Sequence, residues 1–401
     1  MRTRVTCIVA ILVLIAIGFL MACSTKYSSS NNGLVVVPTQ GEAVMQSFSL
    51  DLGNGHLSQI NNTSGPPTPG LPTAVVLDPA GSFAYVIVQE NAVLKPSVTG
   101  IAVFQVASDG KLSSVGTTPV TNPVALAIDS AGKFLFVASG SAGSISVLSI
   151  GPNGSLSAVG KPTSLPAQPG GRTPDASALA VTPTVYPIEF ASCSGFTPPT
   201  TENLYVTDAV NYVLLNYSIS STGSLTLVPT ATNTGVPTGT VPSGVAVDPC
   251  NRFVYVSDAI PNNSVSAYTI CHAVSPANNC PNADFSLQAV AGSPFPAGDN
   301  PGPLAEDAFG NFLYVVDAGS SQISSYRISS STGALTALTE TNISTNSGPT
   351  SIAIRSDDSW MFVANINSAN LSQYAITPAT GALVPQPATS TFNFPSGVAV
   401  K

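Results

Sequence analysis

The residues best suited to chemistry are oxygen-bearing side chains that recur at one position of a repeated pattern. Each follows a short run of aromatic and aliphatic residues, and the four are Asp208, Asp258, Asp317 and Asn365. Such oxygens on one arc can hold a cation or the hydroxyl groups of a sugar. The alternative is that each side chain caps its own turn. The shared repeat position favours capping, because turn chemistry recurs wherever the turn recurs.

A second candidate is Glu306, in the segment PGPLAED that starts at Pro301. Other copies of this segment carry an apolar residue before their acidic one, so turn chemistry does not explain Glu306. With Asp307 beside it, Glu306 is a candidate for acid–base catalysis, for which carboxyl groups of shifted pKa serve when histidine is absent. If the repeated pattern closes into a ring, Glu90 and Arg172 are the other charged side chains that we expect near the mouth of its central channel.

The usual catalytic and cofactor motifs are missing from the sequence. It has two histidines, His56 in an expected hairpin turn and His272 beside Cys271 in an insertion. No Ser-His-Asp order, H-E-x-x-H, phosphate-binding loop or dinucleotide glycine motif is present. We therefore predict no cofactor and no metal.

The elements that must position these residues form an internal repeat of about fifty residues, a period typical of solenoids and propellers. Each copy opens on Pro-x-x-apolar-Ala-apolar-Asp-Pro or a variant of it, and the copies begin at Pro72, Pro123, Asp175, Pro242, Pro301, Pro349 and Pro395. An alternating aromatic strand, a third strand and a Gly-containing hairpin turn follow the opening. Four antiparallel strands per copy make a propeller blade.

The two ends of the chain complement each other. Residues 33–60 supply a second, third and fourth strand but no first strand, and Pro395–Lys401 supplies a first strand alone. Pairing between them would close a ring and leave no open sheet edge. The sequence thus predicts an all-β fold, a seven-bladed β-propeller over residues 33–401 that is closed by N-terminal and C-terminal strands in one blade.

This repeat resembles the YVTN-type repeats and the lactonase-like family of seven-bladed propellers, over roughly Gly33–Lys401. The resemblance implies the propeller fold and the hydrolysis of a sugar lactone, as in 6-phosphogluconolactonases, with histidines and a few charged residues near the starts of the innermost strands. Those positions here hold residues such as Thr73, Ser243 and Thr350, and no histidine. We therefore expect a binding or scaffold module rather than an enzyme, with a lactonase-type hydrolase as the alternative.

The N-terminus has the features of an exported lipoprotein. Arg2 and Arg4 precede a fourteen-residue apolar stretch that ends in Leu-Met-Ala-Cys23, which is shorter than the roughly 20 residues of a membrane-spanning helix. We predict a signal peptide at 1–22, a lipidated Cys23, a flexible tether at 23–32 and a periplasmic or cell-surface location. An uncleaved helical anchor is the alternative.

Composition limits the partners. A net charge of −8, with only twelve Lys and Arg residues, excludes a nucleic-acid partner, because phosphate binding needs clustered cations. The expected partners are the membrane, through Cys23, and a carbohydrate or an envelope protein.

Four cysteines remain beyond the signal peptide and the lipidation site. Closely spaced pairs that would indicate zinc are missing, so an oxidising compartment favours two disulfides. Cys193 and Cys250 occupy equivalent loops of adjacent blades, and Cys271 and Cys280 bracket one insertion. We predict the pairs Cys193–Cys250 and Cys271–Cys280.

Overall fold

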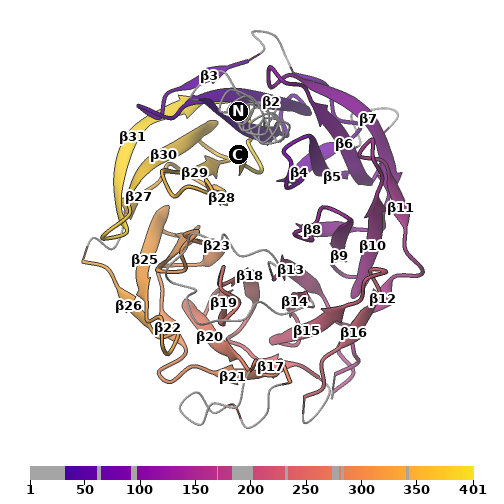
Figure 1. Ribbon diagram of the computed structural model, residues 1–401, viewed down its shortest axis with the longest axis vertical. Coiled ribbons are helices and arrows are strands. Elements are labelled where there is room, and N and C mark those ends of the chain that lie inside the picture. Colours follow the sequence, from indigo (N-terminus) through magenta and orange to yellow (C-terminus); the bar gives the residue numbers. More distant parts are fainter. Residues whose placement is uncertain are drawn as a thin grey trace, which may run out of the picture.

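The computed structural model describes residues 32–60, 65–91, 97–168, 170–182, 202–230, 234–272, 280, 284–339 and 343–401. These residues contain strands and no helix, and no segment among them forms a helix able to cross a membrane. The strands build seven separate antiparallel sheets arranged around one axis (Figure 1). The predicted seven-bladed β-propeller is therefore confirmed.

The innermost strands open the blades and follow the repeat openings found in the sequence. They are β4 (Leu71–Leu77), β8 (Pro123–Ile128), β13 (Ala176–Val181), β18 (Pro242–Val247), β23 (Pro301–Glu306), β28 (Pro349–Ile354) and β32 (Ala399–Val400). Each pairs with a second strand that runs back: β5 (Phe83–Gln89), β9 (Phe134–Ser139), β14 (Asn203–Asp208), β19 (Phe253–Asp258), β24 (Phe312–Asp317), β29 (Trp360–Asn365) and β1 (Asn32–Thr39).

The third strands follow outward, and they are β6 (Gly100–Val106), β10 (Ser144–Ile150), β15 (Val213–Ile219), β20 (Ser264–Ile270), β25 (Gln322–Ile328), β30 (Asn370–Thr377) and β2 (Val44–Asp51). The outermost strand is continuous in two blades, as β7 (Leu112–Pro119) and β31 (Ala382–Ser390). In the blade that contains β1 and β2 it consists of the short β3 (Leu57–Gln59) and a separate bridge between Pro67 and Val44. In the other four it is broken into two short pieces: β11 (Leu156–Ala158) and β12 (Thr163–Ser164), β16 (Leu225–Leu227) and β17 (Val236–Pro237), β21 (Leu287–Ala289) and β22 (Phe295–Pro296), β26 (Leu335–Ala337) and β27 (Ile343–Ser344).

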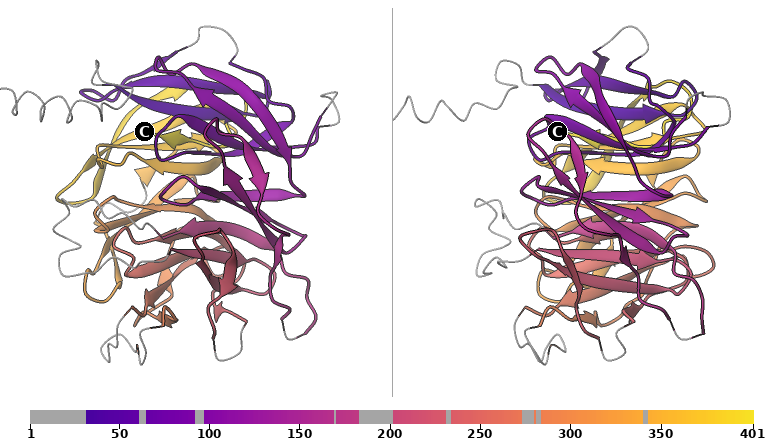
Figure 2. Two further views of the ribbon diagram at one scale, coloured as in Figure 1. Left: turned by 45° about the vertical axis from the view of Figure 1, so that its right-hand side comes forward. Right: turned by 90° about the vertical axis from the view of Figure 1, so that its right-hand side faces the viewer.

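We number the blades in chain order: blade 1 (β4–β7), blade 2 (β8–β12), blade 3 (β13–β17), blade 4 (β18–β22), blade 5 (β23–β27), blade 6 (β28–β31) and blade 7 (β32 with β1–β3). The strands run between two rims of the ring (Figure 2). We call the rim where the inner strands begin and the second strands end the start rim. The opposite rim, which carries the turns from first to second strand and the hairpins from third to fourth, is the turn rim.

Blade 7 closes the ring as the sequence predicts. Val400 pairs with Val35 and Ala399 with Val36 in the antiparallel contact of β32 with β1. The backbone N–H of Leu34 donates to the Lys401 carbonyl at 3.0 Å, and the Lys401 N–H donates to Leu34 at 2.9 Å. β32 therefore supplies the innermost strand that residues 32–60 lack and covers the inner edge of β1.

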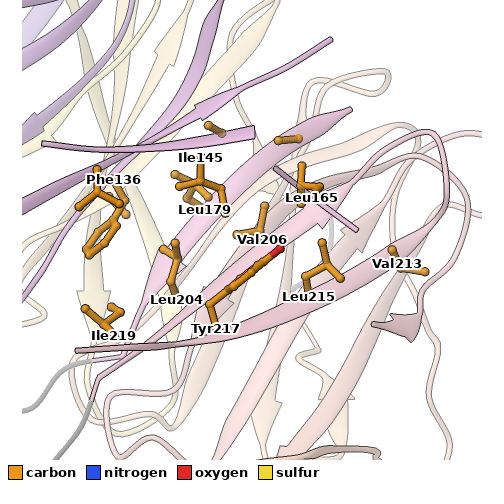
Figure 3. Close-up of a cluster of buried hydrophobic side chains, with 14 residues drawn as sticks. Phe136, Ile145, Leu165, Leu179, Leu204, Val206, Val213, Leu215, Tyr217 and Ile219 are labelled. Carbon is orange, nitrogen blue, oxygen red and sulfur yellow. The ribbon is translucent and has the colours of Figure 1, made fainter. Parts of the chain in front are cut away.

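The hydrophobic core lies between adjacent sheets and is divided into clusters, one of which joins blades 2 and 3 (Figure 3). Phe136 of β9 and Leu179 of β13 contribute to it together with Val206 and Tyr217. The alternating apolar residues of each strand thus face the neighbouring blade on both sides, which explains why central strands such as β14, β19 and β24 are buried along their whole length.

The glycine of the hairpin turn serves the contact between blades. An ideal Cβ placed on Gly381, whose φ is +74°, would lie 2.3 Å from a ring carbon of Phe312 in the preceding blade. The Tyr314 hydroxyl donates to the Gly381 carbonyl at 2.8 Å, and Tyr255 makes the same bond to Gly333 at 3.0 Å. The contact between an aromatic second strand of one blade and the glycine turn of the next blade therefore recurs in the propeller. A larger residue at Gly381 would have to displace the aromatic ring of Phe312.

Candidate functional site

The inner edge of the start rim is built from the repeat openings. Small hydroxyl side chains follow the repeat proline, or Ala176 in its place, and donate to the proline carbonyl of the next blade: Ser177 to Pro242 at 2.7 Å, Ser243 to Pro301 at 2.7 Å, and Ser396 to Pro72 at 2.6 Å. These are positions where the family resemblance led us to look for histidine. In this chain their hydroxyls tie neighbouring blades together.

The four candidate ligand residues lie at the start rim, at the ends of β14, β19, β24 and β29, and each is fully buried. Their hydrogen bonds stay within their own blades. Asp258 accepts from Ser266 at 2.7 Å, and Asp317 accepts from Ser324 at 2.7 Å. These two bonds link the second strand to the third strand of the same blade rather than capping a turn, and binding of a cation or a sugar by this set stays a prediction.

Asp208 and Asn365 occupy the same position with different partners. Asp208 accepts from the backbone N–H groups of Val210 and Asn211, each at 3.1 Å. The Asn365 amide donates to Asn370 at 2.9 Å and to Ser372 at 3.0 Å. An uncharged amide can thus replace the carboxyl group at this position of a blade.

Burial changes the acidity of two of the four. Loss of hydration raises the pKa of Asp258 to about 6 and that of Asp317 to about 6. In each, one carboxyl oxygen, Oδ1, is buried and has no hydrogen-bond partner among the described residues. Each carboxyl group therefore stays protonated to a higher pH than the carboxyl group of an exposed aspartate does.

Glu306 does not join this set. It is the last residue of β23 and so lies at the turn rim, about 17 Å along the strand from Pro301 at a rise of roughly 3.3 Å per residue. Because β23 begins at the start rim and ends at the turn rim, Glu306 lies on the rim opposite the other candidates. The structure therefore does not bring Glu306 together with Glu90, Arg172 or the four candidate ligand residues.

The surroundings of Glu306 are nonetheless unusual. The residue as a whole is half-buried, but both carboxyl oxygens are shielded from solvent and have no hydrogen-bond partner among the described residues. Burial first, and then the charges of Asp248 and Asp307, raise its pKa well above the usual value. The nearby guanidinium of Arg252 is already engaged by Asp248 through two bonds of 2.7 and 2.8 Å. Its surroundings therefore favour the protonated form of the Glu306 carboxyl group.

A carboxyl group that the sequence analysis missed lies at the start rim between blades 2 and 3. Asp175 Oδ1, Asn122 Nδ2 and a Val124 methyl group converge over Gly140, at 3.1, 3.4 and 3.0 Å from where its Cβ would be. Asn122 Nδ2 also donates to the Ser141 hydroxyl at 2.9 Å. We call Asp175, Asn122, Ser141 and Val124 the Asp175 cluster.

The Asp175 carboxyl group is half-buried, and burial together with the charge of Asp208 raises its pKa. Its backbone N–H donates to Asp208 at 3.1 Å, which fixes it beside that second carboxyl group. The residue before the repeat proline in the other six blades is Leu71, Asn122, Val241, Asn300, Gly348 or Phe394. A carboxylate at this one position is the signal by which the repeat alignment could have singled out Asp175.

Among the described residues, no group of three or more His, Cys, Asp and Glu side chains has an arrangement that could hold a metal ion. The chemistry available at the Asp175 cluster is proton transfer and hydrogen bonding. Arg172 lies nearby, exposed, with one guanidinium N–H donating to the Val210 carbonyl at 3.2 Å. Glu90 is exposed at the start rim of blade 1.

The two histidines lie where the sequence analysis placed them. His56 is exposed in the hairpin of blade 7, where its backbone N–H donates to Asn54. His272 is at the turn rim, where its ring contacts the Asn251 carbonyl and packs edge-on against Phe285 at 4.9 Å. Burial lowers the pKa of His272. Neither ring reaches the start rim.

Cys271 and Cys280 form a disulfide, the pairing that their spacing led us to expect. Their Cα atoms are 5.4 Å apart, and the bridge ties off the insertion of blade 4. Cys250 is also disulfide-bonded. Its expected partner, Cys193, lies outside the described residues, as do the signal peptide and Cys23, so these assignments stay predictions.

The fold is an all-β propeller of seven blades. Its start rim carries the half-buried residue Asp175. The sequence model of the family described as "Lactonase, 7-bladed beta-propeller" matches residues 28–178 and 287–401, more than half of the chain. The chain belongs to this family. A search of curated proteins finds no match.

Solved structures with the same fold include a putative 6-phosphogluconolactonase from Bacteroides fragilis, with 16% identity, a TM-score of 0.71 and coverage of 93% of this chain and 99% of that one. Another, from Bacteroides uniformis, has 15% identity, a TM-score of 0.73 and coverage of 93% and 100%. A periplasmic gluconolactonase from Pseudomonas aeruginosa has 18% identity, a TM-score of 0.69 and coverage of 92% and 99%. At these identities the likeness shows the fold.

Proposed function

We propose that this protein is a lactonase-type hydrolase that opens a sugar lactone at the Asp175 cluster. The observation that carries the proposal is the Asp175 carboxyl group, which has a raised pKa and lies over Gly140 on the same side as the Asn122 amide, at the start rim of a lactonase-family propeller. Structural neighbours named as gluconolactonase and as putative 6-phosphogluconolactonases support this activity over the binding role that we expected from the sequence.

In the proposed reaction, the Asp175 carboxylate takes a proton from a water molecule whose oxygen attacks the lactone carbonyl. A raised pKa suits a general base that works near neutral pH. Asn122 Nδ2 can donate to the oxyanion that forms. Collapse of the tetrahedral intermediate breaks the ring C–O bond, and the departing alkoxide takes the proton back from Asp175. One lactone and one water give one hydroxy acid.

The charges of the start rim favour a substrate without a phosphate group. Besides the buried Asp208, Asp258 and Asp317, the described acidic residues there are the exposed Glu42, Glu90 and Asp299 and the half-buried Asp175. Arg172 is exposed, and its guanidinium donates to a backbone carbonyl. A rim of negative sign repels a dianionic phosphate and tolerates a neutral sugar. We propose a neutral aldonolactone as the substrate.

The test is hydrolysis of glucono-δ-lactone by the purified protein, measured as acid release above the spontaneous rate. Asp175→Asn removes the base and should lower kcat by about a hundredfold or more, on the scale of general-base catalysis. Asp299→Asn is the matched control, because Asp299 is an exposed start-rim carboxylate in another blade. No hydrolysis above the blank, or equal rates in wild type and Asp175→Asn, would contradict the proposal.

A binding or scaffold role remains the second candidate, supported by apolar side chains exposed on the start rim. Phe394 is 50% exposed, Ile260 55% and Val241 39%. Phe394 and Val241 also have left-handed backbone conformations, with φ of 59° and 50°, which are uncommon for aromatic and β-branched residues. Capture of one stoichiometric envelope protein by the wild type, but not by Phe394→Ser, would favour this role.

We also propose that the protein is exported and held on a membrane by a lipidated Cys23. The disulfide of blade 4 supports an oxidising compartment, and one structural neighbour is named as periplasmic. Cys23→Ser should release the mature chain into the soluble fraction of cell extracts. Retention of a cleaved Cys23→Ser protein in the membrane fraction would contradict lipidation.

A further inference from the structure

Asp208 of blade 3 differs from its equivalent in blade 4 in what its carboxyl group contacts. Asp258 of blade 4 accepts from the hydroxyl of Ser266 on its own third strand at 2.7 Å. The register of β14 with β15 places Leu215 where β20 has Ser266. The third strand of blade 3 therefore offers no hydroxyl at the place from which Ser266 donates.

The carboxyl group of Asp208 bonds instead to the chain around Asp175 and to the loop that follows β14. Its Oδ1 accepts from the backbone N–H groups of Asp175, Val210 and Asn211, each at 3.1 Å. Its Oδ2 accepts from the side-chain amide of Asn211 at 2.7 Å. Asp208 is fully buried, and these N–H donors compensate a carboxylate for the hydration that it loses on burial.

The charge of Asp208 acts on the carboxyl group of Asp175. Burial first, and then this charge, raise the pKa of Asp175. The side chains that approach the same place from blade 2 are those of Asn122 and Val124, and neither carries a charge. Asp208 is therefore the charged neighbour of Asp175 inside the fold.

Two further ionisable groups lie in this part of blade 3. The guanidinium of Arg172 donates to the Val210 carbonyl at 3.2 Å, and because Arg172 is exposed, water and salt screen its charge. Burial and the charge of Asp208 raise the pKa of the Tyr217 phenol on β15, so that this phenol stays neutral. Neither group offsets the effect of Asp208 on Asp175.

We propose that Asp208 is a positioning residue for Asp175: it fixes the backbone of the base and makes its carboxylate a stronger proton acceptor. The inference rests on the proposed lactone hydrolysis, in which Asp175 takes a proton from water. Without the neighbouring negative charge, Asp175 would ionise at lower pH and accept a proton less readily. Asp258 has no such role in blade 4, because the residue equivalent to Asp175 there is Val241.

The first experiment compares the wild type with Asp208→Asn in the pH profile of kcat/KM for glucono-δ-lactone, measured above the spontaneous rate. The acid limb should move to lower pH and the plateau above it should fall severalfold, so that the two profiles cross. A loss that is merely structural lowers the rate at every pH and gives no crossing. Asn365 of blade 6 shows that an amide fits this position. Asp299→Asn, at an exposed start-rim carboxylate, is the matched control and should keep the wild-type profile.

Asn211→Asp is a second variant that acts in the opposite direction. It adds a carboxyl group at the side chain that now lies 2.7 Å from Asp208 Oδ2. The acid limb should therefore move to higher pH than in the wild type. Thermal unfolding shows which variants are folded, and this variant keeps the test decisive if Asp208→Asn is not.

Titration of the Asp175 carboxyl carbon by ¹³C NMR separates this inference from the proposed function, because it requires no activity. The Asp175 resonance is the one that disappears in Asp175→Asn. Its titration should move to lower pH in Asp208→Asn and to higher pH in Asn211→Asp. Unchanged titration in the folded variants overturns the role of Asp208. A shifted titration in a protein that hydrolyses no lactone supports the influence of Asp208 on Asp175 and contradicts the proposed function.

Discussion

Replacing Asp258 by Asn tests whether the buried carboxyl groups of the start rim serve the fold or bind a ligand. Burial raises the pKa of Asp258 from an ordinary 3.8 to about 6. The unfolded chain therefore ionises at lower pH than the folded one. This group's contribution to stability is complete below about pH 4 and is lost as the pH rises through about 6.

The size of the effect follows from the two pKa values. A difference of about 2 between them corresponds to about 3 kcal/mol at 1.36 kcal/mol per pH unit. Asn does not titrate, and Asn365 shows that an amide fits this position of a blade. Asp258→Asn should therefore raise the free energy of unfolding by up to about 3 kcal/mol at pH 7.5 and leave it unchanged at pH 3.5.

The assay is urea unfolding of the wild type, Asp258→Asn and the exposed control Asp299→Asn at both pH values. Asp317→Asn should behave like Asp258→Asn, because burial also raises the pKa of Asp317 to about 6. A variant less stable than the wild type at pH 7.5 would refute the reasoning. It would mean that the ionised carboxylate is needed, as a cation or sugar site at these residues requires.

Three further predictions concern the ring and its buried groups. Deleting Pro395–Lys401 should destabilise the whole ring by several kcal/mol, because it uncovers β1 and removes the buried Val398 and Ala399; a truncated protein that unfolds at the same urea concentration would refute closure by β32. Glu306→Gln should be more stable than the wild type at pH 8 and equal to it at pH 4, since a carboxyl group of raised pKa lowers stability as the pH rises. The same difference in stability at both pH values would contradict a raised pKa of Glu306. Non-reducing peptide mapping should join Cys250 to Cys193, and a peptide joining Cys250 to another cysteine would show the predicted pairing wrong.

The sequence predicts the fold well because each blade repeats one pattern of strands and turns. The openings at Pro242, Pro301 and Pro349 each begin an inner strand, and the lone opening at Pro395 marks the strand that closes the ring. The repeat period and the order of the strands are enough to predict the seven blades, because consecutive antiparallel strands pair with their neighbours.

The candidate site is harder to predict because it depends on where side chains point. Asp258 and Asp317 lie on the expected rim, but their carboxyl groups turn into their own blades, which strand period does not reveal. Strand direction could have placed Glu306 at the turn rim, since it ends its strand where Pro301 begins it. Asp175 was missed because its blade lacks the usual proline, which hides its place in the repeat.

The most direct test of the account is the rate of glucono-δ-lactone hydrolysis by the wild type, Asp175→Asn and Asp299→Asn, with 6-phosphoglucono-δ-lactone as the comparison substrate. We expect hydrolysis by the wild type and by Asp299→Asn, and a large loss of kcat in Asp175→Asn. We also expect a higher kcat/KM for the unphosphorylated lactone. Preference for the phosphorylated lactone would contradict the proposal that the substrate is neutral, but it would not contradict lactone hydrolysis. Rates no higher than the spontaneous reaction, or undiminished activity in a folded Asp175→Asn, would contradict the catalytic site itself.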